Sequence, residues 1–96
     1  MKALVLLANG TEEMEAVITC DILARSGIKV FKAAVHDDES NELVLTCALG
    51  TKIVADFSLN HIMSELDDYS IIILPGGSKG AETFCKVYPI TSALSN

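Results

Sequence analysis

Apolar residues gather in continuous runs that predict strands buried on both faces. Residues 3–8 read Ala-Leu-Val-Leu-Leu-Ala, and residues 70–74 contain Ile-Ile-Ile-Leu. Uninterrupted apolar runs of this length are typical of parallel strands that helices cover on both sides. A third segment, residues 28–35, predicts another strand of the same sheet.

Between the strands predicted at residues 3–8 and 28–35, apolar residues recur at the spacing of a helix. They are Met14, Val17, Ile18 and Ile22. This period predicts a helix over residues 12–26, with Thr11 as its N-cap and Gly27 as its stop. Further apolar residues widen this face beyond one stripe: Ala16, Cys20, Leu23 and Ala24. We therefore expect the helix to be buried on more than one side, by the sheet and by a second subunit.

The remaining elements complete an α/β pattern. Residues 43–48 and 51–55 predict a hairpin around Gly50, and Ser58 is placed to cap a helix over residues 59–66. Short helices are expected near residues 81–85 and 90–94. The order predicts one doubly wound α/β domain over residues 1–96 with a parallel core. Because no strand follows the last helix, the sheet is expected to be incomplete in this chain.

Composition and charge narrow the class of function. The chain has 96 residues, half of them hydrophobic, and a net charge of -6, which argues against nucleic-acid or anionic-membrane binding. No apolar run approaches a membrane span, and the N-terminal run is too short for a secretory signal. Three widely spaced cysteines suggest neither a disulfide framework nor a metal site, so we expect a cytoplasmic location and no cofactor.

Carboxylates follow the first predicted strand, where open α/β sheets bind ligands. Glu12 and Glu13 are well explained as solvated charges that complement the start of a helix. Glu15 lies among apolar residues and has two readings. It either faces into the packing, where it could exchange a proton with a ligand, or occupies the exposed polar strip.

Glycines follow the last predicted strand at the same edge of the sheet. Gly76 and Gly77 could turn backbone N–H groups toward an oxyanion, or could simply make a tight turn. The stretch lacks both nucleotide-binding glycine patterns, which excludes that reading. Each cysteine is expected to be structural, and His36 and His61 are assigned no role.

Together these segments resemble a known family. Residues 6–17 (Leu-Leu-Ala-Asn-Gly-Thr-Glu-Glu-Met-Glu-Ala-Val), 27–30 (Gly-Ile-Lys-Val) and 74–77 (Leu-Pro-Gly-Gly) carry the likeness. They resemble the N-terminal half of the ThiJ/PfpI superfamily, in the branch that includes YajL and the human Parkinson-disease protein. The resemblance covers all 96 residues and implies a flavodoxin-like sandwich and a homodimer.

The resemblance also implies roles for individual residues. Glu15 matches the glutamate that hydrogen-bonds the family's nucleophilic cysteine, and Gly76 and Gly77 match the turn that lines the same pocket. Cys47 matches a cysteine near the dimer interface and is a redox candidate. The expected interface residues are Met14, Val17, Ile53 and Val54. Leu49 stands where close relatives often have an arginine, so anion binding there is not expected.

The implied activity is glyoxalase or deglycase chemistry on small reactive dicarbonyls or glycated substrates, in protection from oxidative stress. The family's nucleophilic cysteine and nearby histidine fall beyond residue 96, so this chain is expected to contain no nucleophile. A homodimer or a companion C-terminal chain would have to complete the site. Two alternatives stay open: a redox-sensing chaperone without turnover, and an inactive fragment.

Overall fold

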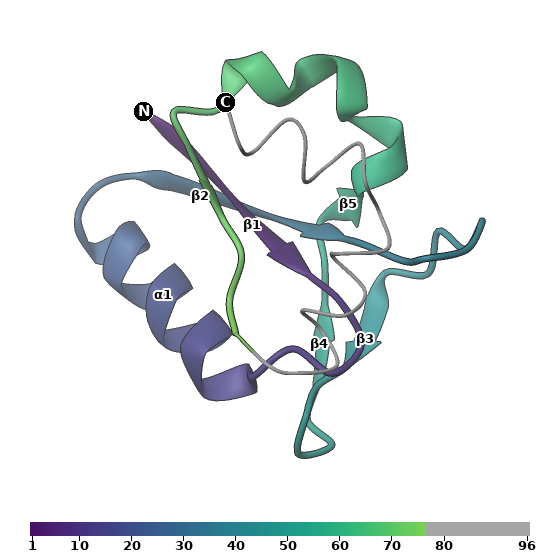
Figure 1. Ribbon diagram of the computed structural model, residues 1–96. Coiled ribbons are helices and arrows are strands. Elements are labelled where there is room, and N and C mark those ends of the chain that lie inside the picture. The colour runs from purple at the N-terminus through teal and green to yellow at the C-terminus, as the bar shows by residue number, and fades with distance from the viewer. Residues whose placement is uncertain (77–96) are drawn as a thin grey trace.

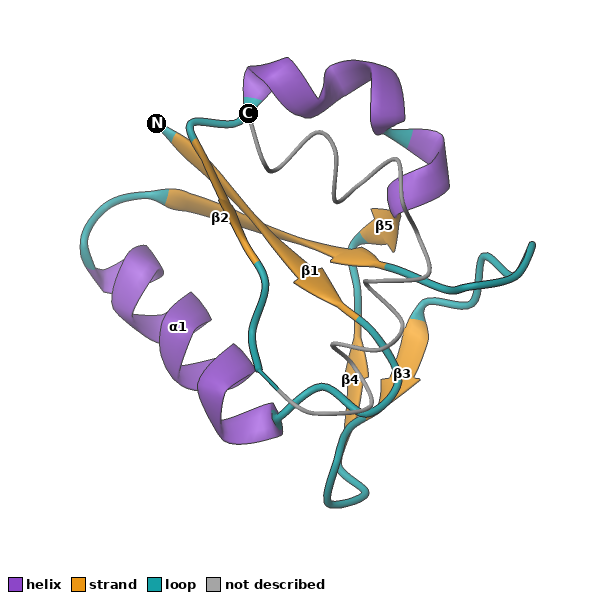
Figure 2. Ribbon diagram, viewed as in Figure 1, coloured by secondary structure: helices purple, strands orange, loops and turns teal. Residues whose placement is uncertain are grey.

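The computed structural model describes residues 1–76 as an α/β unit built on a four-stranded parallel sheet in the order β5-β2-β1-β6 (Figure 1). One α-helix covers one face, and two 3-10 helices cover the other (Figure 2). The elements of the main sheet and its helices are β1 (Lys2–Leu7), α1 (Glu13–Arg25), β2 (Lys29–Ala34), β5 (Phe57–Ser58), η1 (Leu59–His61), η2 (Met63–Asp68) and β6 (Ile71–Ile73). A separate antiparallel pair consists of β3 (Val44–Thr46) and β4 (Lys52–Val54).

Strand β1 lies at the centre of the sheet and is buried along nearly its whole length, as its apolar run predicts. Successive side chains of a strand point to opposite faces. Leu4 and Leu6 therefore join the core beneath η1 and η2. Val5 and Leu7 join a second core with Ala16 of α1 and with the hairpin. Burying each leucine contributes about 1.5–3 kcal/mol, so β1 anchors both layers.

Helix α1 begins one residue later than the sequence suggests. Glu12, rather than Thr11, is the N-cap, because the Glu12 side chain accepts a hydrogen bond from the Met14 backbone N–H at 2.9 Å. Thr11 is instead fully buried, and its hydroxyl accepts a hydrogen bond from the Ala8 N–H. The prediction of Thr11 as the cap was wrong because two adjacent residues can both cap, and burial of Thr11 against the β1 end decided the choice.

The expectation that α1 is buried on more than one side is not met within the described chain. Of its residues only Ala16 is fully buried, and the four periodic apolar residues Met14, Val17, Ile18 and Ile22 are all exposed. The helix packs on the sheet through Ala16, Cys20 and Leu23. Its wider apolar surface faces outward.

The segment after the hairpin differs most from its prediction. Residues 59–66 form two 3-10 helices rather than one α-helix, and Ser58 makes no capping bond. The Ser58 hydroxyl donates to the Asn41 side chain at 2.8 Å instead. Residues 57–58 form β5, which the sequence did not predict, because a two-residue strand leaves no periodic signal.

Strand β6 was expected to be buried on both faces and is only half-buried. It pairs with β1 in parallel and lies at the edge of the described sheet. The helices expected at residues 81–85 and 90–94, together with Gly77 and Cys85, lie outside the described residues. Among residues 1–76, no helix has the length and apolarity needed to cross a membrane.

Candidate functional site

The candidate site lies where β1 and β6 end side by side. The parallel register pairs Val5 with Ile73, so the segments that follow these strands leave the sheet at the same edge (Figure 1). The first turns into α1 and the second reaches Gly76. They are joined directly, because the Glu12 N–H donates to the Gly76 carbonyl oxygen at 2.8 Å.

Glu15 and Gly76 are in contact across this junction. A Cβ atom built on Gly76 would lie 2.5 Å from Glu15 Oε2 and 3.3 Å from the other carboxylate atoms. The glutamate thus occupies the space that a side chain at position 76 would need. Glu15 is exposed, as the second interpretation expects, and does not face into the helix packing; its carboxylate lies beside Gly76. An exposed carboxylate beside a backbone turn can exchange protons with a small ligand.

Glu13 has a role that sequence reasoning missed. It was expected to be a solvated helix charge, but its carboxylate accepts hydrogen bonds from the hairpin turn. The Leu49 N–H lies 3.1 Å from both carboxylate oxygens, and the Thr51 N–H lies 3.3 Å from one. No local pattern signals this contact, because the partners are more than 35 residues apart in sequence.

These hydrogen bonds have an electrostatic consequence. The pKa of Glu13 is lowered from the ordinary value of 4.5, chiefly by its own backbone N–H and further by the N–H groups of Leu49 and Thr51. Partial desolvation opposes this effect and is outweighed. Glu13 is therefore a carboxylate throughout the neutral range.

The two described cysteines are held as thiols. Burial raises the pKa of the Cys47 thiol above 9.0, and the charges of Glu13 and Glu12 raise it further. Burial also raises the pKa of Cys20, although the Lys32 ammonium opposes the change. Both environments disfavour the thiolate, which is the reactive form. The redox assignment of Cys47 stays a prediction, and its surroundings do not activate it.

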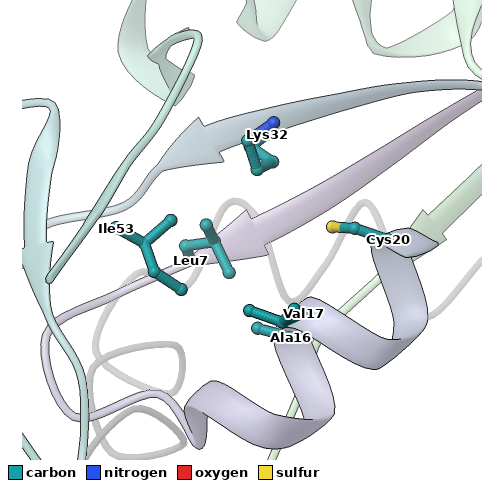
Figure 3. Close-up of a pocket in the computed structure, with 6 residues that line it drawn as sticks. All are labelled: Leu7, Ala16, Val17, Cys20, Lys32 and Ile53. Carbon is teal, nitrogen blue, oxygen red and sulfur yellow. The ribbon is translucent and has the colours of Figure 1, made fainter. Parts of the chain in front are cut away.

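A shallow groove of about 210 Å³ lies on the α1 side of the sheet (Figure 3). Its lining comes from α1, β1, β2 and β4: Leu7, Ala16, Val17, Cys20, Lys32 and Ile53. The lining is mostly apolar, with the Lys32 ammonium 3.5 Å from the Asp56 carboxylate. Within residues 1–76, no cluster of three or more histidine, cysteine or acidic side chains could hold a metal ion.

Comparison with known proteins gives the family. The sequence model of the DJ-1/PfpI family matches residues 1–94. The chain belongs to the DJ-1/PfpI family. This confirms the resemblance drawn from residues 6–17 and 74–77, and DJ-1 relatives place the chain in the DJ-1-like branch.

Named relatives support the assignment. Protein dj-1beta of Drosophila melanogaster is 40% identical over 79 residues, covering 82% of this chain and 39% of the relative. Glutathione-independent glyoxalase DJR-1.2 of Caenorhabditis elegans is 38% identical over 76 residues, which cover 78% of this chain and 37% of the relative. The structure of oxidized Toxoplasma gondii DJ-1 matches with a TM-score of 0.85 at 33% identity, and the match covers 98% of this chain and 48% of that protein. The chain thus spans less than half the length of these relatives.

The DJ-1/PfpI chain brings together two of the three residues predicted to be catalytic. Glu15 and Gly76 touch, and Gly77 lies outside the described residues. Of the predicted interface residues, Met14, Val17 and Val54 are exposed, whereas Ile53 is half-buried in the groove. The structure therefore supplies the geometry of a carboxylate beside a glycine turn, on the sheet edge where the sequence predicted a site.

Proposed function

We propose that this chain forms part of a glyoxalase-type protein of the DJ-1/PfpI family, acting on small reactive dicarbonyls such as methylglyoxal. The observation that carries the proposal is the contact between the Glu15 carboxylate and Gly76. A relative that is 38% identical is named a glutathione-independent glyoxalase, which supports this substrate class.

The proposed chemistry needs one nucleophile and one group that moves protons. A thiolate adds to the aldehyde carbon of methylglyoxal, and the carbonyl oxygen becomes an alkoxide that takes up a proton. Glu15 removes the proton on that carbon and returns it to the neighbouring carbon, while the hydroxyl proton passes to the neighbouring carbonyl oxygen. The product is a lactoyl thioester of the cysteine, in which the former aldehyde carbon is oxidised and its neighbour is reduced. Water then releases lactate and regenerates the thiol. No external oxidant or reductant is consumed.

The described thiols do not suit the nucleophilic step. Cys20 and Cys47 are buried or half-buried, and their raised pKa values favour the protonated form. We assign the nucleophile to a cysteine beyond residue 96, in the part of the family fold that this chain does not span. A reducing compartment such as the cytosol would keep that thiol available.

Product analysis tests this proposal. The whole protein is incubated with methylglyoxal without glutathione, and lactate is measured alongside suppression of aggregation of an unrelated client protein. Lactate formation supports the glyoxalase assignment. Protection of the client with no loss of methylglyoxal would overturn it and favour the redox-chaperone alternative.

We also propose that the exposed apolar surface of α1 and the hairpin is a homodimer face. Met14, Val17 and Val54 have exposed fractions of 66%, 55% and 60%. Large apolar side chains exposed on a folded surface can mark a contact with another protein. The groove that Val17 and Ile53 line lies beside α1 and would receive side chains of the second copy.

Substitution on this face tests the dimer. Val17→Asp would place a charge in the proposed contact and should shift the protein from dimer to monomer in sedimentation. Lys29→Asp, a charge change at an exposed position outside this face, serves as the control. A dimer that persists in Val17→Asp with unchanged affinity would contradict the proposal.

A further inference from the structure

The first turn of α1 is held between two segments that are far apart in the sequence. On one side the Glu13 carboxylate accepts the N–H groups of Leu49 and Thr51 from the hairpin turn. On the other side the Glu15 carboxylate lies against Gly76, the residue whose carbonyl oxygen accepts the Glu12 N–H. The helix therefore enters the site already tied to the hairpin.

The geometry of a helix makes these two contacts interdependent. Residues two positions apart project about 200° from one another around the helix axis. Glu13 and Glu15 consequently point to nearly opposite sides of the same turn. If the Glu13 contact fixes how that turn is rotated, it also sets the direction in which the Glu15 side chain leaves the helix, toward Gly76.

The hairpin is a firm support for such a contact. Its turn is bound to the β1–α1 loop by backbone hydrogen bonds that do not involve Glu13. Gly10 N–H donates to the Thr46 carbonyl oxygen at 2.9 Å, and Ala48 N–H donates to the Thr11 carbonyl oxygen at 2.9 Å. Asn9 adds a side-chain bond from the Thr46 N–H. Glu13 thus binds a hairpin turn that other hydrogen bonds already hold in place.

We infer that Glu13 is a positioning residue: its hydrogen bonds to the hairpin turn keep the Glu15 carboxylate beside Gly76. The inference rests on the proposed catalytic role of Glu15, but its geometric content can be tested without any substrate. Both carboxylate oxygens of Glu13 are engaged. An amide in its place would turn an N–H₂ group toward backbone donors, and an aspartate would be one methylene too short to reach.

Nuclear magnetic resonance of the whole protein tests the geometry. In Glu13→Gln and in Glu13→Asp, the amides of Leu49 and Thr51 should exchange with solvent about tenfold faster, because a charged acceptor is lost or withdrawn. The α-proton signals of Gly76 should move in the direction that Glu15→Gln moves them. Glu65→Gln, which removes an exposed carboxylate from η2, should change neither signal.

Each other outcome overturns the inference. Unchanged exchange at Leu49 and Thr51 would mean that the carboxylate does not hold the turn. If the Leu49 and Thr51 amides exchange faster but the Gly76 signals do not move, the Glu13 hydrogen bonds hold the hairpin turn without positioning Glu15. A Gly76 shift in Glu13→Gln but not in Glu13→Asp would mean that charge, rather than grip, is responsible.

Kinetics provide the second readout. With methylglyoxal as substrate, both Glu13 variants should lower kcat about fivefold to tenfold and leave KM within about twofold, because a displaced Glu15 affects proton transfer more than binding. A rise in KM of about the same factor, with kcat unchanged, would contradict a positioning role. Absence of turnover in the unsubstituted protein would count against the proposed function, while the resonance experiment would still decide the inference.

Discussion

Replacing Gly76 by alanine isolates the contact on which the proposed function depends. The new Cβ would lie 2.5 Å from Glu15 Oε2, whereas real contacts of this kind essentially never fall below 3.0 Å. The carboxylate must therefore move by roughly 0.5–1 Å, the shift that brings a 2.5 Å approach to 3.0–3.4 Å. It is the flexible end of an exposed side chain, so it can move with little loss of folding stability. Gly76 does not have a positive φ, so the alanine adds no backbone strain.

A displacement of this size should be visible in catalysis. Misplacing a reacting group by about 1 Å can cost about a hundredfold in rate, so we expect kcat for methylglyoxal to fall about 10–100-fold. This loss corresponds to about 1.4–2.7 kcal/mol of activation free energy. Thermal unfolding should change little in the same variant.

Gly27→Ala gives the matched control for Gly76→Ala. Gly27 has a φ of +83° and no atom within 4 Å of a Cβ placed there. The alanine should cost about 1 kcal/mol of stability through the left-handed backbone and leave turnover unchanged. Gly76→Ala with full activity, or activity lost only in proportion to stability, would refute the reasoning that the Glu15 position controls the reaction.

Three further predictions concern the hairpin, the thiols and the isolated chain. Because the folded pKa of Glu13 lies below 4.5, its hydrogen bonds stabilise the fold above pH 4.5 and are lost as pH falls through the folded pKa. Amide exchange at Leu49, corrected for intrinsic rates, should therefore lose protection only in that acidic range, and loss of protection near neutral pH would contradict this. Cys20 and Cys47 should alkylate at least about tenfold more slowly at pH 8 in the folded protein than in urea, by peptide mass spectrometry. Equal rates would show that neither burial nor charge protects them. Residues 1–96 alone should be oligomeric or poorly soluble in size-exclusion chromatography, since α1 exposes apolar side chains, and a stable monodisperse monomer would count against this.

Strands β1, β2 and β6 of the main sheet could be predicted from the sequence because they carry strong local signals, whereas β5 could not. The apolar run of residues 3–8 is buried as predicted, and the helical period of residues 14–22 lies within α1. The hairpin around Gly50 is also confirmed, with Gly50 at a φ of +97° in the turn. In each case the local preference and the tertiary packing agree.

The parts that the sequence missed depend on contacts between distant residues. Glu13 looks like any acidic residue in a first helical turn, and only the folded hairpin makes it an acceptor for Leu49 and Thr51. Similarly, Ser58 has the residue type of a helix cap, but Asn41 accepts its hydroxyl. Glu15 shows the opposite case. Its position on the helix left two interpretations open, and only the folded chain shows that the residue is exposed with its carboxylate beside Gly76.

The most direct test of the proposed function is the rate of methylglyoxal conversion by Glu15→Gln in the whole protein. The amide keeps the size of the side chain and removes its ability to take up a proton. If Glu15 moves protons beside Gly76, kcat/KM should fall about 10²–10⁴-fold while Glu65→Gln keeps the unsubstituted rate. Unchanged turnover in Glu15→Gln would contradict the assignment of Glu15 as the catalytic group.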